Sequence, residues 1–152
     1  MNNYEAPMAN VESTIAEFKP VRGIIYSLLI AVVGVSIFSL VGSIVAIVLS
    51  GVSFIDEEAV DAALSQNALF MVIDAIGSLV LLVLAGRVLA KYVPGKEMLF
   101  SLIVTTLVLC VYGSTFAFVE GTFSSFPIWY NVVSVLSLLI GIPIGARQGR
   151  KA

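Results

Sequence analysis

Four long runs of apolar residues constrain the fold of this chain more than any other feature. A helix needs roughly 20 mostly apolar residues to cross the hydrocarbon core of a bilayer, which is about 30 Å thick. The runs reach that length and cover residues 23–50, 68–91, 98–118 and 128–146. Because the bilayer core offers no water to the backbone, each run is expected to be helical. The sequence therefore predicts an all-α integral membrane protein, a four-helix bundle with four transmembrane helices.

The composition argues against several other classes of protein. Of the 152 residues, 59% are hydrophobic and 12% are charged, against about 25% charged residues in an average soluble protein. The net charge of −2 does not supply the basic surface that nucleic-acid binding requires, so no nucleic-acid partner is expected. Histidine is absent and Cys110 is the only cysteine, which argues against metal clusters, disulfides and a nucleophile–base pair. We therefore expect a protein without a cofactor, a metal ion or catalytic activity.

The basic residues predict the orientation in the membrane. All eight Lys and Arg residues fall on one side of a four-helix topology, and the loops of the other side, 51–67 and 119–127, contain none. Because cytoplasmic loops carry an excess of Lys and Arg, both termini are expected in the cytoplasm. The expected location is the plasma membrane, as a multi-pass protein of the bacterial inner membrane. The residues that set this topology are Lys19, Arg22, Arg87, Lys91, Lys96, Arg147, Arg150 and Lys151.

The chain divides into three parts. Residues 1–22 form a cytoplasmic N-terminal segment, residues 23–146 the transmembrane domain and residues 147–152 a basic cytoplasmic tail. The first part is expected to contain a short amphipathic helix that stops at Pro20. This helix is either an anchor on the membrane surface, which we favour, or a docking element for a partner. Four apolar residues at helical spacing form its face, namely Met8, Val11, Ile15 and Phe18.

Small residues indicate where the helices pack, because they allow the close backbone approach on which association in lipid depends. The third run offers Thr106, Cys110 and Gly113, and Pro143 is expected to bend the fourth run. Two further sets are expected to pack helices together: Ser39, Gly42, Ser43 and Ala46 in the first run, and Ser137, Gly141 and Gly145 in the fourth.

The loops on the outer side contain two recognisable patterns. Ser53 and Asp56 resemble the cap of a short helix that would run to about Leu64. Aromatic residues before and at the start of the fourth run are typical of a belt at the outer membrane interface, and they are Phe123, Phe126, Trp129 and Tyr130.

Asp74 is the only acidic or basic residue deep inside an apolar run. It lies about seven residues, or ~10 Å, below the outer end of its helix. Counting the same depth along the other runs reaches Ser43, Tyr112 and Ser134, with Asn131 about one turn above. These residues form a candidate intramembrane polar site around the carboxyl group.

Two interpretations of Asp74 remain open. It is either a polar clamp that joins helices, or a group that handles a proton or a cation. Transport paths usually contain several ionisable groups or broken helices, and this chain has one acid without a basic partner at its level. We therefore favour the clamp.

The function expected from these features is that of an accessory, assembly or immunity-type subunit. Such a protein acts through helix–helix or surface contacts and has the lipid bilayer as its solvent. Its partner would be a second copy of the chain or another membrane protein. The alternative is a small oligomeric transporter or channel that moves protons or cations along a path containing Asp74.

Overall fold

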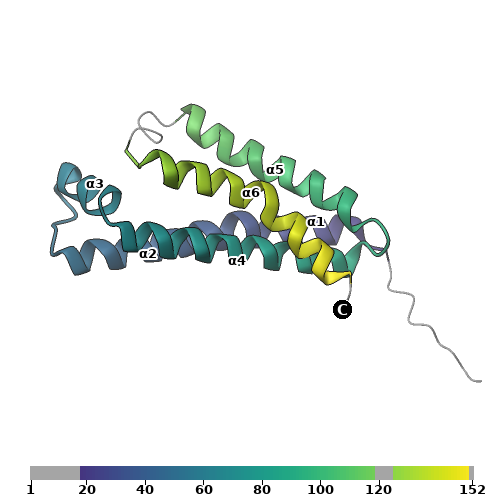
Figure 1. Cartoon of the computed structure of the whole chain (residues 1–152). Coiled ribbons are helices and arrows are strands. Elements are labelled where there is room, and N and C mark those ends of the chain that lie inside the picture. Colours follow the sequence, from purple (N-terminus) through teal and green to yellow (C-terminus); the bar gives the residue numbers. More distant parts are fainter. Residues whose placement is uncertain (1–17, 119–124, 151–152) are drawn as a thin grey trace, which may run out of the picture.

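The computed structural model of the chain describes residues 18–118 and 125–150, and Figure 1 shows its ribbon. In this part of the chain every regular element is a helix and no strand occurs. The predicted amphipathic helix, Phe123 and Lys151 lie outside the described residues. Four helices are long and apolar enough to cross a membrane. The all-α prediction is confirmed, and the four helices indicate a multi-pass membrane protein.

The first span is one continuous helix of 31 residues. It consists of α1 (Pro20–Leu28), the π-helical segment η1 (Leu29–Gly34) and α2 (Val35–Ser50). The span begins at Pro20, three residues earlier than predicted. The amphipathic helix that was expected to stop at Pro20 lies in residues that the structure does not describe. Proline suits the first position of a helix, where its missing N–H is not needed. Arg22 therefore lies inside the helix, and the span starts before residue 23.

A short helix, α3 (Glu57–Ser65), follows the first span. It was predicted, but its cap differs from the expected one. The Asp56 carboxylate accepts a hydrogen bond from the backbone N–H of Ala59 at 3.1 Å, which makes Asp56 the capping residue. The Ser53 hydroxyl instead accepts a long 3.4 Å contact from the N–H of Ile55.

The other three spans are α4 (Ala68–Tyr92), α5 (Glu97–Phe118) and α6 (Ile128–Gly149). Each begins and ends within three residues of its predicted run. The Asn67 side chain caps α4 by accepting a hydrogen bond from the N–H of Phe70 at 3.0 Å. Between α4 and α5, Gly95 has a φ of 79°, the left-handed backbone conformation that suits glycine in a tight turn.

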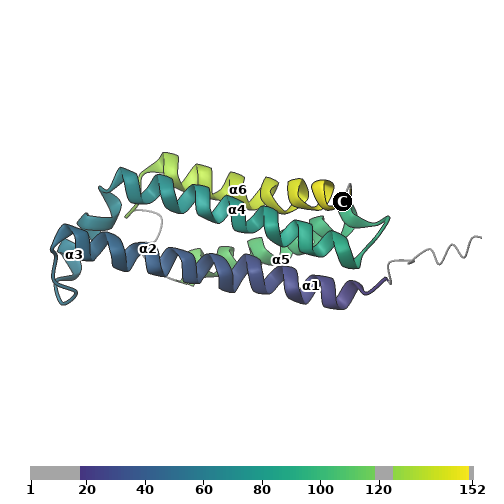
Figure 2. The ribbon, with the colours of Figure 1, turned by 90° about the horizontal axis from the view of Figure 1, so that it is seen from below.

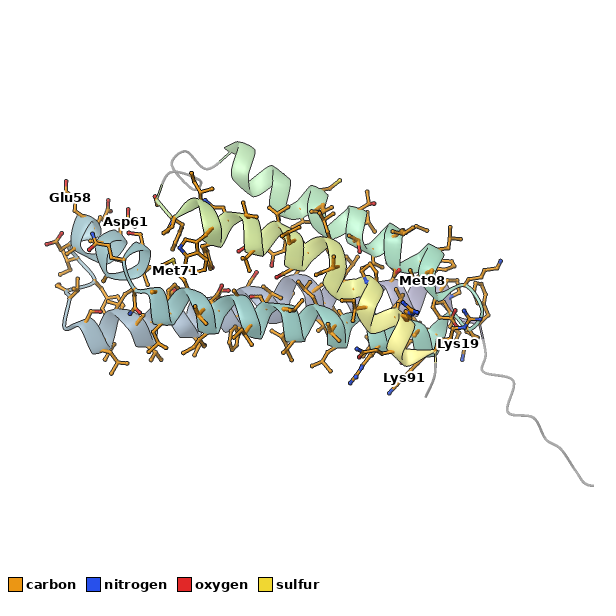
Figure 3. The ribbon with its side chains drawn as sticks, in the orientation of Figure 1. Lys19, Glu58, Asp61, Met71, Lys91 and Met98 are labelled. Carbon is orange, nitrogen blue, oxygen red and sulfur yellow. The ribbon has the colours of Figure 1, made fainter. Side chains whose placement is uncertain are left out.

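Helix α4 lies at the centre of the bundle. It contacts α1 and α2 on one side and α6 on the other, while α5 packs mainly along α6 (Figures 1 and 2). Successive spans run in opposite directions, so the described Lys and Arg residues gather at one end, which we call the basic end. The acidic residues of α3 lie at the other end, which we call the acidic end. Figure 3 shows Lys19 and Lys91 at the former and Glu58 and Asp61 at the latter.

Helices α4 and α6 approach each other at backbone distance near the basic end. A Cβ atom added to Gly145 would lie 1.9 Å from the carbonyl oxygen of Val83. A Cβ atom on Gly86 would lie 2.1 Å from the carbonyl oxygen of Ile142. Real Cβ atoms do not fit at such distances, so glycine is required at both positions. Pro143 lies inside this stretch of α6.

The small residues of the first span and those of α5 differ in whether they pack against another helix. In the first span, Ala46 is buried and Gly42 faces the ring of Phe70 on α4. On α5, by contrast, Thr106, Cys110 and Gly113 are exposed, and a Cβ atom on Gly113 would meet no described atom within 4 Å. The α5 set therefore packs against no helix of the described chain.

The half of the bundle nearest the basic end has a closed apolar core. Leu89, Val93, Val104 and Ile142 are each 0% exposed. The Ser27 and Thr105 hydroxyls are also buried there and have no hydrogen-bond partner among the described residues. Together with the glycine contact between α4 and α6, these side chains fill this half.

We expect Gly145→Ala to lower the free energy of unfolding by about 2–3 kcal/mol, because the added methyl group forces two backbones apart. The same substitution at Gly34 is the matched control. There the added Cβ atom would meet, among the described residues, only its own helix, Ile30 at 3.9 Å and Leu29 at 4.0 Å, and the higher helix propensity of alanine should leave stability unchanged or slightly raised. Denaturation of the detergent-solubilised protein, followed by circular dichroism, measures both. Equal stability of the two variants would contradict the close contact.

Candidate functional site

Asp74 lies in the second turn of α4 and is 6% exposed. Its Oδ1 atom accepts a hydrogen bond from the Ser39 hydroxyl of α2 at 2.6 Å. Its Oδ2 atom accepts one from the Tyr130 hydroxyl of α6, also at 2.6 Å. One side chain thus joins three spans.

A cavity of about 220 Å³ lies beside this carboxylate. Its walls come from α2, α4, α5 and α6, together with Phe126 at the entry to α6. Most of the surface that lines it is apolar, and Val35, Leu82 and Leu138 line its end towards the apolar core. The polar side chains that line it are Ser39, Asp74, Ser78, Tyr112, Tyr130, Asn131, Ser134 and Ser137.

The structure brings together four of the five residues of the predicted polar site. Asp74, Tyr112, Asn131 and Ser134 all line the cavity. Ser43 does not line it, and its hydroxyl donates to the backbone carbonyl of Ser39 at 2.8 Å instead. Equal counting assumes that all spans end at the same level, but Ser39, which meets Asp74, lies eleven residues before the end of α2 at Ser50, whereas Asp74 lies six residues after the start of α4 at Ala68.

Tyr112 connects the cavity wall to the π-helical segment. Its hydroxyl donates to the backbone carbonyl of Ala31 at 3.5 Å, a long contact between α5 and η1. Ser36 lies within hydrogen-bonding reach of the same hydroxyl. The tyrosine ring is therefore oriented by one group of η1 and one at the start of α2, and it lines the cavity.

Sequence reasoning did not assign Ser39 and Tyr130 to the site. Ser39 was predicted only as a packing residue, and Tyr130 was placed in the outer aromatic belt. Tyr130 instead points inward, with Ser134 beside its hydroxyl. A signal was present in the sequence, because Tyr130, Ser134 and Ser137 recur at spacings of 4 and 3 and therefore share one helical face.

The site can accept a proton or hold a positively charged group, because it contains a single carboxylate. No group of three or more His, Cys, Asp or Glu residues that could hold a metal ion occurs among the described residues. Within residues 18–118 and 125–150, no Lys or Arg forms an ion pair with Asp74. No protein-family model, no curated protein and no solved structure matches this chain.

We expect Tyr130→Phe to lower the free energy of unfolding by about 1–2 kcal/mol, because Oδ2 of Asp74 loses its donor while the ring is kept. The matched control is Tyr26→Phe, since Tyr26 is 45% exposed and contacts Tyr92 through its ring. That change should alter stability by less than about 0.5 kcal/mol. Denaturation in detergent compares the two, and equal effects would refute a role for the Tyr130 hydroxyl in the clamp.

Proposed function

We propose that this chain is a non-catalytic subunit of the plasma membrane, the inner membrane of a bacterium, that works through contacts with other membrane helices. Its role would be that of an accessory, assembly or immunity-type protein. The observation that carries this proposal is the use of Asp74. The only carboxylate deep in the described spans holds α2 and α6 to α4, which is a structural task. Because these hydrogen bonds fix the positions of three spans, the outer faces of the helices keep one arrangement that a partner helix can contact.

The proposed orientation places the basic end in the cytoplasm. The described basic residues lie at that end, and the acidic helix α3 lies at the other. Basic residues at the ends of spans are retained on the cytoplasmic side. Under this orientation α3 and the entry to α6 face the outside of the cell.

The proposed contact face is the exposed side of α5, made of Thr106, Cys110 and Gly113. Large apolar side chains on a span are satisfied by lipid, whereas small side chains leave room for the backbone of another helix. In α4 and α6 the glycines pack against other helices of the same chain, whereas Thr106, Cys110 and Gly113 are exposed. A second copy of the chain is the partner we propose for this face.

Cross-linking through Cys110 tests this contact, because the chain has no other cysteine and Cys110 is exposed. Mild oxidation of native membranes should give a disulfide-linked dimer if two α5 helices bring their Cα atoms within ~7 Å. Gly113→Leu should largely abolish the dimer, since the larger side chain separates the helices.

The matched control moves the single cysteine to another exposed position. Ile37→Cys in a Cys110→Ser chain places it on α2, where residue 37 is 56% exposed, and should give little dimer. Equal cross-linking of the two chains, or a dimer that Gly113→Leu leaves unchanged, would contradict α5 as the contact face.

The alternative function, transport of protons or cations past Asp74, has less support from the geometry. The cavity ends near Leu82 and Leu138, and the apolar core closes the half beyond it. Proteoliposomes that contain the wild-type chain should therefore show no flux of protons or cations above that of empty vesicles. Asp74→Asn should still fold, because the amide keeps an acceptor oxygen, while Asp74→Ala should be destabilised. Flux that Asp74→Asn abolishes would establish the transport function instead.

A further inference from the structure

The carboxylate of Asp74 can accept more hydrogen bonds than the two that join the helices. An ionised carboxylate offers about four lone-pair sites, and the two hydroxyl donors occupy two of them. Asp74 also lines the cavity. The nearest basic residue along α4 is Arg87, thirteen residues further on, which corresponds to about 20 Å of helix. A buried anion without a countercharge stabilises any cation that can reach it.

The walls of the cavity favour a cation with an apolar surface. The rings of Tyr112, Phe126 and Tyr130 all line it, and those of Phe126 and Tyr130 lie 5.2 Å apart between centroids. Aromatic faces attract a cation within about 6 Å, and ammonium groups are often recognised by several rings together. Aliphatic side chains such as Val35 and Val135 form much of the remaining wall.

The size of the cavity limits what it can hold. Its volume of about 220 Å³ is many times the ~10–15 Å³ that a single water requires. It is smaller than the ~300 Å³ at which sites for drug-sized ligands begin. Ca²⁺ and Mg²⁺ need six or more oxygen ligands at short range, carboxylates among them, and the lining supplies one carboxylate beside neutral hydroxyl and amide groups. A small organic cation fits both the volume and the walls.

Access is favoured from the acidic end. The cavity reaches Phe126 and Tyr130, where α6 begins, and it ends at the apolar core. Helix α3 and its cap carry four acids at that end, and the described part of the chain has no basic residue there. A surface of one sign raises the local concentration of ions of opposite sign. The four acids are Asp56, Glu57, Glu58 and Asp61.

We propose that the cavity between α2, α4, α5 and α6 binds a small organic ammonium cation, whose charge pairs with Asp74 and whose apolar groups contact Tyr112 and Tyr130. This goes beyond the contact function proposed above, because it requires no partner. A folded chain that binds no such cation leaves the cross-linking result intact, and the reverse also holds. The two proposals therefore fail separately.

Choline is a suitable probe, and 3,3-dimethyl-1-butanol is its uncharged analogue of the same shape. Calorimetric titration of the full chain in mild detergent should show saturable binding of choline and none of the analogue at equal concentration. Trp129, the only tryptophan in the chain, contacts Tyr130 edge to face at 5.9 Å between centroids, so its fluorescence should change with the same dependence on concentration.

Three variants locate the binding. Asp74→Asn, which keeps the size of the side chain, should weaken choline binding about tenfold or more. Tyr112→Leu removes one ring without touching the clamp and should weaken it several-fold. Tyr26→Leu, at a half-exposed position that does not line the cavity, is the matched control and should change it less than twofold. Circular dichroism verifies that each variant is folded.

Four outcomes would overturn the proposal. They are no binding of choline by the folded wild-type chain, equal binding of the neutral analogue, unchanged affinity in folded Asp74→Asn, and displacement of choline by sodium at equal concentration. The last would assign the site to an inorganic cation.

Discussion

The backbone contact between α4 and α6 determines the shape of the whole bundle. Gly86 and Gly145 let the two helices touch near the basic end, and no side chain separates them there. Towards the acidic end α6 diverges from α4 (Figure 1). One half of the bundle is therefore filled by apolar side chains, and the other half contains the cavity beside Asp74. Two helices that meet closely at one end and separate at the other leave space between them.

The polar residues beside the cavity are explained by the hydrocarbon that surrounds the spans. Hydrocarbon offers no hydrogen bonds, so a carboxylate inside a span must find its donors within the protein. Ser39 and Tyr130 provide them from two different helices, and this stabilises the arrangement of three spans around the cavity. The same two bonds hold the carboxylate in place at the cavity wall. A structural clamp and a preorganised cation site are compatible, because the clamp supplies the orientation that a ligand would otherwise have to impose.

Much of the fold could be predicted from the sequence, and less of the site. The spans, the short helix α3 and the tight turn at Gly95 all have local causes, namely apolar length, acidic capping residues and a positive φ. The start of the first span was predicted three residues too late, because the charge-free run begins only after Arg22. At the site, depth alone suggested Ser43, whereas the hydroxyl that reaches Asp74 belongs to Ser39. Tyr130 was assigned to the membrane interface because aromatic residues there are common.

The sequence by itself determined how many helices span, where they end, that the basic residues share one end and that one acid lies deep in a span. These properties depend on the order and hydropathy of residues along the chain, whatever the rotation of each helix about its axis. Only the tertiary structure decided which side chains face inward. The rotation of a helix depends on the surfaces packed against it, and a π-helical turn such as η1 changes the rotation of all residues after it. For this reason the partners of Asp74, the inward position of Tyr130 and the exposed face of α5 emerged only in three dimensions.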